Sequence, residues 1–294
     1  MRIFDGHTHL QKTRLDQIQN RSPVNQETKT VIRKWYDKLG FPSLYDGQFA
    51  DALDRIPISD TLTPETFDWS GEDGQQNLLS VLYMCEGLSR RYAQLGIPEE
   101  ILMDTLADVV RWLDVWSDIK GQMYLGEMGW LRWHFLMKIF KLGRLQFLIG
   151  YAKRDIPERG VQTGDPILDI HIPNAGPLTP EECDRSLKMA LEFFPKYFPE
   201  HIFTVFTCYS WLLDDTLKGF LPESSNILRF QNRFTPVART CSDALLGFVF
   251  GWQTTREQLQ NRPAETRLKK GIKTHIQKNG RFYVVLGYMP KEDH

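Results

Sequence analysis

One stretch of the chain, residues 166–194, constrains the fold more than any other. It begins with the apolar run Pro166–Ile172, passes through a turn rich in proline and glycine, and continues with helical spacing of its apolar residues. Thr179 fits the N-cap of that helix, Pro180 its first position, and Glu182 the acid of a capping box. Backbone N–H groups converge at such a junction and carry positive potential, which suits either a ligand site or a purely structural turn.

The spacing of apolar residues changes along the chain. Recurrence every three or four positions predicts helices at 26–39, 45–56, 76–94, 99–119 and 125–141. Alternation with period two predicts strands at 144–152, 166–172, 202–209, 226–237 and 281–289, with helices from 180 to about 195–199 and at 263–278. We therefore expect an α+β fold, in which a mostly helical N-terminal region (residues 1–122) packs on a C-terminal domain with a mixed β-sheet and flanking helices (residues 123–294).

Charge and composition argue against several classes of function. The chain has 36 basic and 37 acidic residues among 294, so it lacks the field that collects nucleic acid or an anionic membrane. Its longest apolar run, 244–252, is shorter than the roughly 20 residues that span a bilayer. The four cysteines lack the spacing of a zinc site, which favours free thiols. We expect a cytoplasmic protein without nucleic-acid or membrane partners, and leave the oligomeric state open.

A His-x-His pair, His7 and His9, follows Phe4 and Asp5 near the N-terminus. Metal-dependent amidohydrolases open their barrel in this way, with two imidazoles sharing a divalent metal. That fold requires further histidine and aspartate ligands at later strand ends, but the next histidine, His134, lies in a predicted helix. We expect no bound metal and keep a metal-dependent hydrolase as a remote alternative.

Residues suited to proton transfer stand at two predicted strand ends. His171 closes the strand 166–172, and histidine titrates near neutral pH, so it can accept the proton of an amine nucleophile. Tyr209 and Ser210 follow the next strand, where a leaving group would need a proton. The alternatives are structural: a histidine bonded to the following turn, and a tyrosine whose hydroxyl finds a local partner.

Arg229 and Arg233 share one face of the predicted strand 226–237. Two guanidinium groups about 7 Å apart on a strand can hold a phosphate or a carboxylate, because arginine binds both in a bidentate manner. The alternative is the solvated polar face of an antiparallel strand.

Several motifs of the C-terminal half together resemble a family of acyltransferase domain-containing proteins. The motifs are Leu142–Phe147, His171–Pro173 with Pro177–Thr179, Ser210–Asp214, and Ser225–Ile227 with Arg229–Gln231. In that family a helical N-terminal region precedes a GNAT-like (N-acyltransferase-like) domain. The resemblance implies a GNAT-like fold and transfer of an acyl group from acyl-CoA or acetyl-CoA to an acceptor, such as an amine on a small molecule or peptide.

The resemblance also implies a site. Pantetheine would lie along the strand that includes Ile170 and Ile172, with a backbone N–H near Ile172 stabilising the oxyanion. The pyrophosphate would meet the turn of Asn174, Ala175 and Gly176. His171 would act as base, and Tyr209 would protonate the departing thiolate.

This turn departs from the family pattern, Gln/Arg-x-x-Gly-x-Gly/Ala. It contains only Gly176, and its prolines have no N–H to donate, while Glu181 and Glu182 bring negative charge to the helix start. The alternative function is therefore a non-catalytic GNAT-like module that binds an acyl or carboxylate ligand, or a partner protein.

Overall fold

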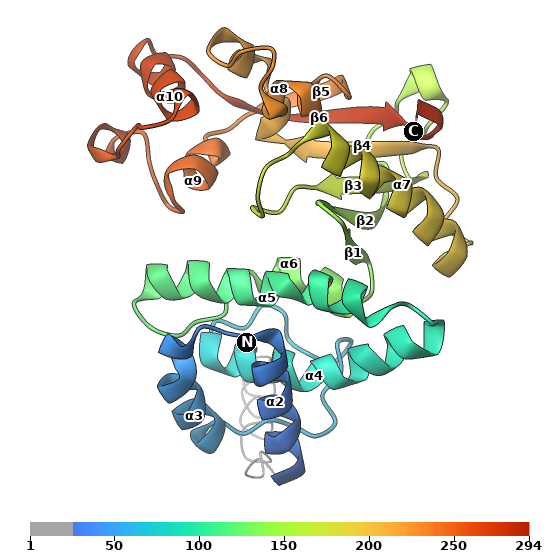
Figure 1. Ribbon diagram of the computed structural model, residues 1–294, viewed down its shortest axis with the longest axis vertical. Coiled ribbons are helices and arrows are strands. Elements are labelled where there is room, and N and C mark those ends of the chain that lie inside the picture. Colours follow the sequence, from blue (N-terminus) through green and yellow to red (C-terminus); the bar gives the residue numbers. More distant parts are fainter. Residues whose placement is uncertain (1–25, 294) are drawn as a thin grey trace, which may run out of the picture. The chain divides into compact units, whose positions relative to one another are not determined.

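The computed structural model describes residues 26–293 (Figure 1). The chain divides into two compact units, one ending at Leu136 and one beginning at Met137. This division falls after helix α6 (Met128–Phe135), whereas the sequence-based boundary after residue 122 falls before it. The pair His7 and His9 lies outside the described residues.

The first unit is helical, as the periodicity predicts. It contains α2 (Gln26–Leu39), α3 (Asp46–Arg55), α4 (Gly74–Leu95), α5 (Glu99–Lys120) and α6. Helix α4 packs against the other four and buries most of its length, including Leu78, Leu79 and Leu82. Asp73 begins α4 by accepting the backbone N–H groups of Gln75 and Gln76.

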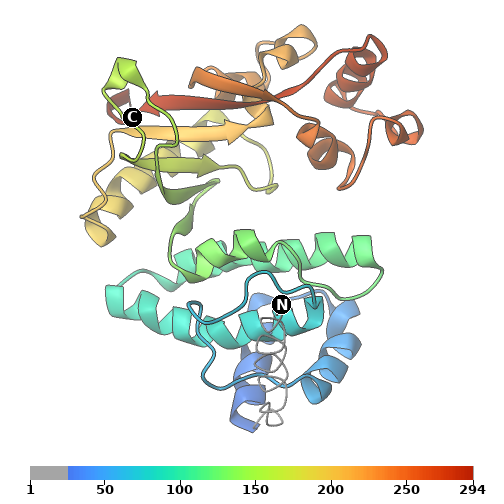
Figure 2. The same cartoon turned by 180° about the vertical axis from the view of Figure 1, so that it is seen from behind.

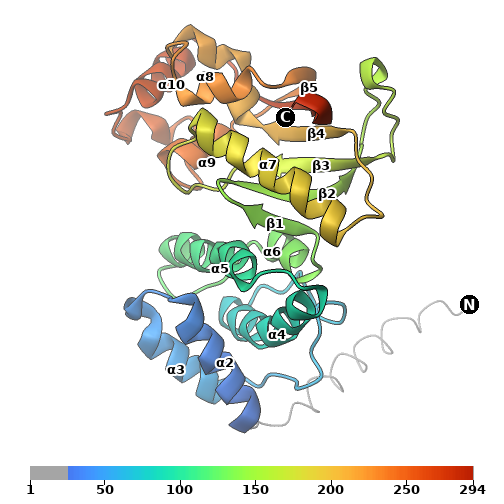
Figure 3. The ribbon, with the colours of Figure 1, turned by 45° about the vertical axis from the view of Figure 1, so that its right-hand side comes forward.

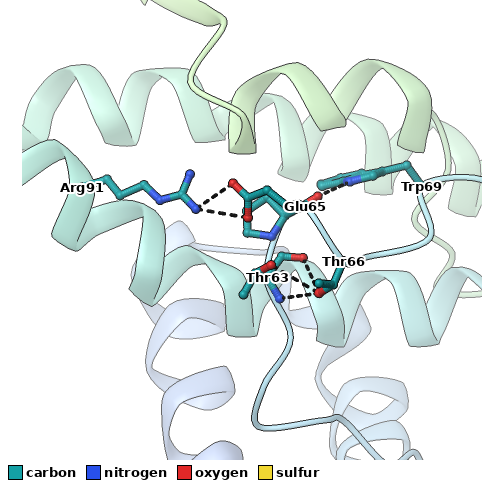
Figure 4. A network of polar contacts seen from close by, with 6 residues as sticks. Thr63, Glu65, Thr66, Trp69 and Arg91 are labelled. Atoms are coloured by element: carbon teal, nitrogen blue, oxygen red, sulfur yellow. Dashed lines mark hydrogen bonds and ion pairs between the residues drawn. The ribbon is translucent and has the colours of Figure 1, made fainter.

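The loop between α3 and α4 is fastened to α4 by polar contacts (Figure 4). Two oxygens of the Glu65 carboxylate lie 3.0 and 3.3 Å from Arg91 of α4. The indole of Trp69 donates to the carbonyl of Pro64 at 2.8 Å, and Thr63 and Thr66 bond to each other. This loop is therefore an ordered part of the unit.

The second unit is built on a six-stranded sheet with the order β1-β2-β3-β4-β6-β5 (Figures 1 and 3). The strands are β1 (Ile139–Leu142), β2 (Leu145–Tyr151), β3 (Pro166–His171), β4 (Val205–Ser210), β5 (Thr235–Cys241) and β6 (Tyr283–Pro290). The pair β3–β4 is parallel, and the other neighbours are antiparallel. This mixed sheet with flanking helices confirms the predicted fold class.

The two faces of the sheet are covered differently. Helix α7 (Pro180–Tyr197) lies across one face, where Phe194 meets Phe147 of β2 at 6.4 Å between ring centroids (Figure 3). Figure 2 shows the opposite face. There Ile167, Val205 and Tyr288 pack with residues of the loop between β2 and β3 at the start of β3 and β4, so that loop covers the beginning of the two strands.

Two predicted elements were wrong. The helix predicted at 125–141 ends at Phe135, because Met137 takes a left-handed backbone (φ 53°) and Ile139 starts a β-hairpin. The strand predicted at 226–237 is α8 (Asn226–Gln231) followed by β5. Ser225 caps α8 by accepting the N–H of Leu228 at 3.2 Å, and short apolar runs do not distinguish a helical turn from a strand. Beyond β5, α9 (Ala244–Phe250) and α10 (Arg267–Gln277) share a small core.

Candidate active site

The sheet separates in its middle, between β3 and β4. These strands pair at only two positions, Leu168 with Phe206 and Asp169 with Thr207. On its other edge β3 stays paired with β2 as far as His171, and β4 stays paired with β6 as far as Ser210. The last residues of the two parallel strands therefore remain in the sheet but no longer pair with each other.

His171 and Tyr209 lie at this separation, at the same level of the two strands. Each stands two residues beyond the last pair, Asp169 with Thr207. Because side chains alternate along a strand, His171 shares a face with Asp169, and Tyr209 shares it with Thr207. The side chain of His171 is 30% exposed and Tyr209 is 54% exposed. The strand register thus places the residues predicted as base and acid on one face of neighbouring strands, and their catalytic roles stay predictions.

A series of polar contacts leads from β4 to His171. The Thr207 hydroxyl donates to Oδ1 of Asp169 at 2.6 Å, and Nε2 of His171 lies 3.2 Å from Oδ2 of the same carboxylate. Asp169 is therefore fixed from β4, and its carboxylate lies beside the imidazole on β3. Sequence reasoning missed both Asp169 and Thr207. The spacing of two between Asp169 and His171 on a predicted strand was a usable signal for the first, whereas Thr207 needed the strand register.

Two other residues near the end of β4, Cys208 and Ser210, make contacts that serve the fold. Ser210 accepts the N–H of Leu212 at 3.1 Å and so begins a 3₁₀ turn, and its predicted catalytic role stays a prediction. Cys208 is fully buried, and burial raises the pKa of its thiol well above the ordinary value. A buried neutral thiol is a poor nucleophile.

The turn between β3 and α7 is exposed from Asn174 to Pro177. Gly176 has a left-handed backbone (φ 79°), which favours glycine. Ile170 is buried and Ile172 is half-buried on the strand side of the turn. Their predicted contacts with a cofactor, and those of Asn174, Ala175 and Gly176, stay predictions.

The predicted cap of α7 is confirmed in part. Thr179 accepts the N–H of Glu182 at 3.3 Å, but the carboxylate of Glu182 pairs with Arg185 at 2.5 Å. Arg144, from the turn between β1 and β2, donates three hydrogen bonds to carbonyls of the β3–α7 turn. Sequence reasoning did not assign Arg144 to this turn.

Arg229 and Arg233 do not share a strand face, because residues 226–231 form α8. Arg229 is exposed on α8. Arg233 lies 2.5 Å from the carboxylate of Asp184 and donates to the carbonyl of Pro180 at 3.3 Å, so it supports the start of α7. The geometry that we predicted for the pair is wrong, and a ligand contact of either arginine stays a prediction.

Neither a metal cluster nor a helix that could span a membrane is found in the described part of the chain. Within residues 26–293 there is no group of three or more His, Cys, Asp or Glu side chains that is arranged to hold a metal ion. Among the same residues, no helix is both long and apolar enough to span a membrane.

Comparison with known families assigns both units. The model of a GNAT-like C-terminal domain matches residues 139–289, and that of an N-acyltransferase N-terminal domain matches residues 43–137. The chain belongs to the N-acyltransferase family with a GNAT-like C-terminal domain. This confirms the resemblance seen in the sequence, and the two matches meet where the structure divides.

Solved structures similar to this N-acyltransferase-family chain are acyltransferases. One, in complex with decanoyl-CoA and teicoplanin, has 23% identity, a TM-score of 0.73, and coverage of 98% of this chain and 96% of its own. A mutant in complex with octanoyl-CoA has 22% identity, a TM-score of 0.74 and the same coverage. A complex with decanoyl-CoA has 26% identity, a TM-score of 0.70, and coverage of 92% and 89%. No curated protein matches the chain.

Proposed function

We propose that this chain transfers an acyl group from acyl-CoA to an amine, with the reaction centred where β3 and β4 separate. The observation that carries the proposal is the placement of His171 and Tyr209 on one face, two residues beyond the last strand pair. The family assignment supports N-acyl transfer, and neighbours that were solved with octanoyl-CoA and decanoyl-CoA support a medium-chain donor. Neighbours solved with teicoplanin make an amine-bearing glycopeptide one acceptor class to test.

The proposed reaction is direct attack of the amine nitrogen on the thioester carbonyl. His171 accepts the proton that the amine loses, and Asp169 stabilises the imidazolium that results. The N–H of Ile172, just beyond β3, stabilises the oxyanion of the tetrahedral intermediate. Collapse of that intermediate breaks the carbon–sulfur bond, and Tyr209 donates its proton to the departing thiolate. Tyr209 then regains a proton from solvent, and His171 releases to solvent the proton that it took from the amine.

The same arrangement suits a soluble cosubstrate rather than a resident cofactor. Acyl-CoA or acetyl-CoA would bring the pantetheine arm along the end of β3, and no metal is needed for the steps above. The four cysteines are free thiols, which supports the cytoplasm as the compartment. The acceptor is a small-molecule or peptide amine.

The test is release of free coenzyme A from acyl donors of increasing chain length, assayed with pooled amines that include a glycopeptide. We expect turnover, and replacing His171 with Asn should lower kcat by about 10²–10⁴-fold without weakening acyl-CoA binding. Tyr209→Phe should also lower kcat. Tyr151→Phe should not, because Tyr151 is exposed and lies beside Pro166, at the opposite end of β3 from His171. Absence of both turnover and coenzyme A binding would exclude the proposal.

The proline-rich turn favours a second candidate, a GNAT-like module that binds ligand without catalysis. Thermal unfolding with acyl-CoA, coenzyme A and pantetheine separates the two. Equal stabilisation by coenzyme A and pantetheine, together with no turnover for any amine, would favour the binding module.

A further inference from the structure

Arg144 connects two turns that are distant in the sequence. It follows Gly143 in the turn between β1 and β2, and its guanidinium reaches the turn between β3 and α7. There Nη1 donates to the carbonyl of Pro173 at 2.9 Å, Nη2 to that of Gly176 at 3.0 Å, and Nε to that of Pro177 at 3.0 Å. One side chain therefore holds most of the exposed turn.

The backbone of Arg144 is itself fixed. The hydroxyl of Ser186 on α7 accepts the N–H of Arg144 at 2.7 Å and that of Leu145 at 3.2 Å, and donates to the carbonyl of Glu182 at 2.9 Å. A Cβ at Gly143 would come within 2.9 Å of the same hydroxyl, so the hairpin turn needs a glycine to approach α7 this closely. The backbone from which the Arg144 side chain extends is thus held in place by α7.

The three bonds decide where the N–H groups of the turn point. The described residues contain no cis peptide bond, and in a trans peptide the carbonyl of one residue and the N–H of the next point in opposite directions. Because the carbonyls of Pro173 and Pro177 face Arg144, the N–H groups of Asn174 and Leu178 face away from it. The carbonyl of Gly176 precedes Pro177, which has no N–H.

We infer that Arg144 is a positioning residue for the pyrophosphate of coenzyme A: it holds the carbonyls of the turn so that the N–H groups of Asn174 and Leu178 face away from the guanidinium and can serve as donors to the pyrophosphate. This role rests on the proposed acyl-CoA-dependent function. It explains how a turn with a single glycine presents an anion with donors, since the side chain of a neighbouring hairpin replaces the conformational constraint of a glycine-rich loop.

The charge around the turn supports the same inference. Arg233 and Arg144 both act electrostatically on the thiol of Cys183, in the first turn of α7. Burial raises the pKa of that thiol to about 11, and the two positive charges oppose the rise. Two arginines therefore act on the start of α7, where Glu182 and Asp184 are engaged in ion pairs with Arg185 and Arg233.

The test compares two donors that differ in the pyrophosphate. S-acyl-pantetheine carries the thioester and the pantetheine arm but lacks the nucleotide part. For Arg144→Ala we expect the KM for acyl-CoA to rise on the order of tenfold, the size expected when charge-assisted hydrogen bonds are lost. Neither kcat with acyl-CoA nor kcat/KM with S-acyl-pantetheine should change. Arg144→Lys reaches fewer carbonyls and should give an intermediate KM.

Arg185→Ala is the matched control. Like Arg144→Ala, it removes one positive charge near the start of α7, but Arg185 is on α7 itself and pairs with the carboxylate of Glu182 rather than with a carbonyl of the turn. It should leave both donors unaffected. Equal loss with both donors would show that Arg144 has only a structural role, and unchanged kinetics with acyl-CoA would also overturn the inference. If Arg144→Ala fails to fold, Arg144→Lys carries the comparison.

The two proposals fail separately. A wild-type chain without turnover would overturn the acyltransferase function. In that case calorimetric binding of coenzyme A and of pantetheine to the full chain still tests Arg144. A difference in affinity between the two ligands that disappears in Arg144→Ala and shrinks in Arg144→Lys would support the positioning role, and a difference that is unchanged in both variants would exclude it.

Discussion

The two parallel strands of the sheet end at the same edge, but the turns that follow them are built in opposite ways. After β3, residues 174–177 are exposed, and an arginine from another hairpin holds their carbonyls. After β4, Leu212, Leu213 and Asp214 are buried, and side chains of the segment occupy its own N–H groups. In the first turn a side chain from elsewhere occupies the carbonyls, and in the second turn side chains of the same segment occupy N–H groups.

In the turn after β4, side chains bond both N–H groups and carbonyls of the backbone. Asp214 accepts the N–H of Thr216 at 3.0 Å and that of Tyr283 at 2.8 Å. The amide of Gln231 donates to the carbonyls of Leu212 and Asp214 at 3.3 and 2.7 Å. The N–H groups of Leu212 and Thr216 are therefore closed to a ligand. The proposed site after β3 depends on the reverse arrangement, in which side-chain donors hold the carbonyls of the turn.

The largest effect that tests this contrast is on stability. Asp214→Ala leaves the N–H groups of two half-buried residues, Thr216 and Tyr283, without their acceptor, and we expect it to lower the free energy of unfolding by about 2–4 kcal/mol. Asp214→Asn keeps one acceptor and should lose less. In the other turn, Asn174→Ala alters only an exposed side chain and should change stability by no more than about 0.5 kcal/mol. Urea denaturation measures both, and equal losses in the two turns would contradict the comparison.

Sequence reasoning recovered the elements around the first turn because their signals are local. The apolar run of β3, the cap at Thr179 and the first proline of α7 lie within fifteen residues of one another. The alternation of side chains also predicted His171 at the strand end. Arg144 escaped notice because its acceptors lie 29–33 residues away, on the far side of β2 and β3. Contacts of that range depend on strand pairing, which the apolar pattern does not specify.

The strand predicted at 226–237 was wrong for a similar reason: contacts that the local pattern does not show decided the structure. Residues 228–231 alternate apolar and polar side chains, as a strand does, yet they lie in the helix α8. The cap at Ser225 and the burial of Gln231, whose amide serves the turn after β4, outweigh the alternation. The predicted arginine pair was lost because it depended on that strand.

A smaller effect, on kcat, is expected from a substitution where β3 and β4 pair. Thr207→Val keeps the shape of the side chain but removes the hydroxyl that donates to Asp169 at 2.6 Å. We expect kcat to fall about tenfold, which corresponds to about 1.4 kcal/mol and is the scale of one hydrogen bond to a charged group. The KM for acyl-CoA should not change, because the turn after β3 is untouched. Thr204→Val, at an exposed residue before β4, is the control. A rise in KM with unchanged kcat would show that Thr207 acts on binding rather than on His171.

The smallest effect isolates the backbone of the first turn. Gly176 has φ 79°, and a Cβ there would meet no atom within 4 Å, so Gly176→Ala introduces strain without a clash. Gly160 is a matched control, with φ 65° and equally open surroundings in a loop away from the site. Both alanine variants should lose about 1 kcal/mol of stability, because both force an L-residue into the left-handed region. Only Gly176→Ala should also raise the KM for acyl-CoA, since relaxing that strain rotates the carbonyls away from Arg144 and the opposing N–H groups with them. If the two variants raise the KM equally, or neither does, then the orientation of this turn does not determine coenzyme A binding, and the contrast between the two strand ends is one of stability alone.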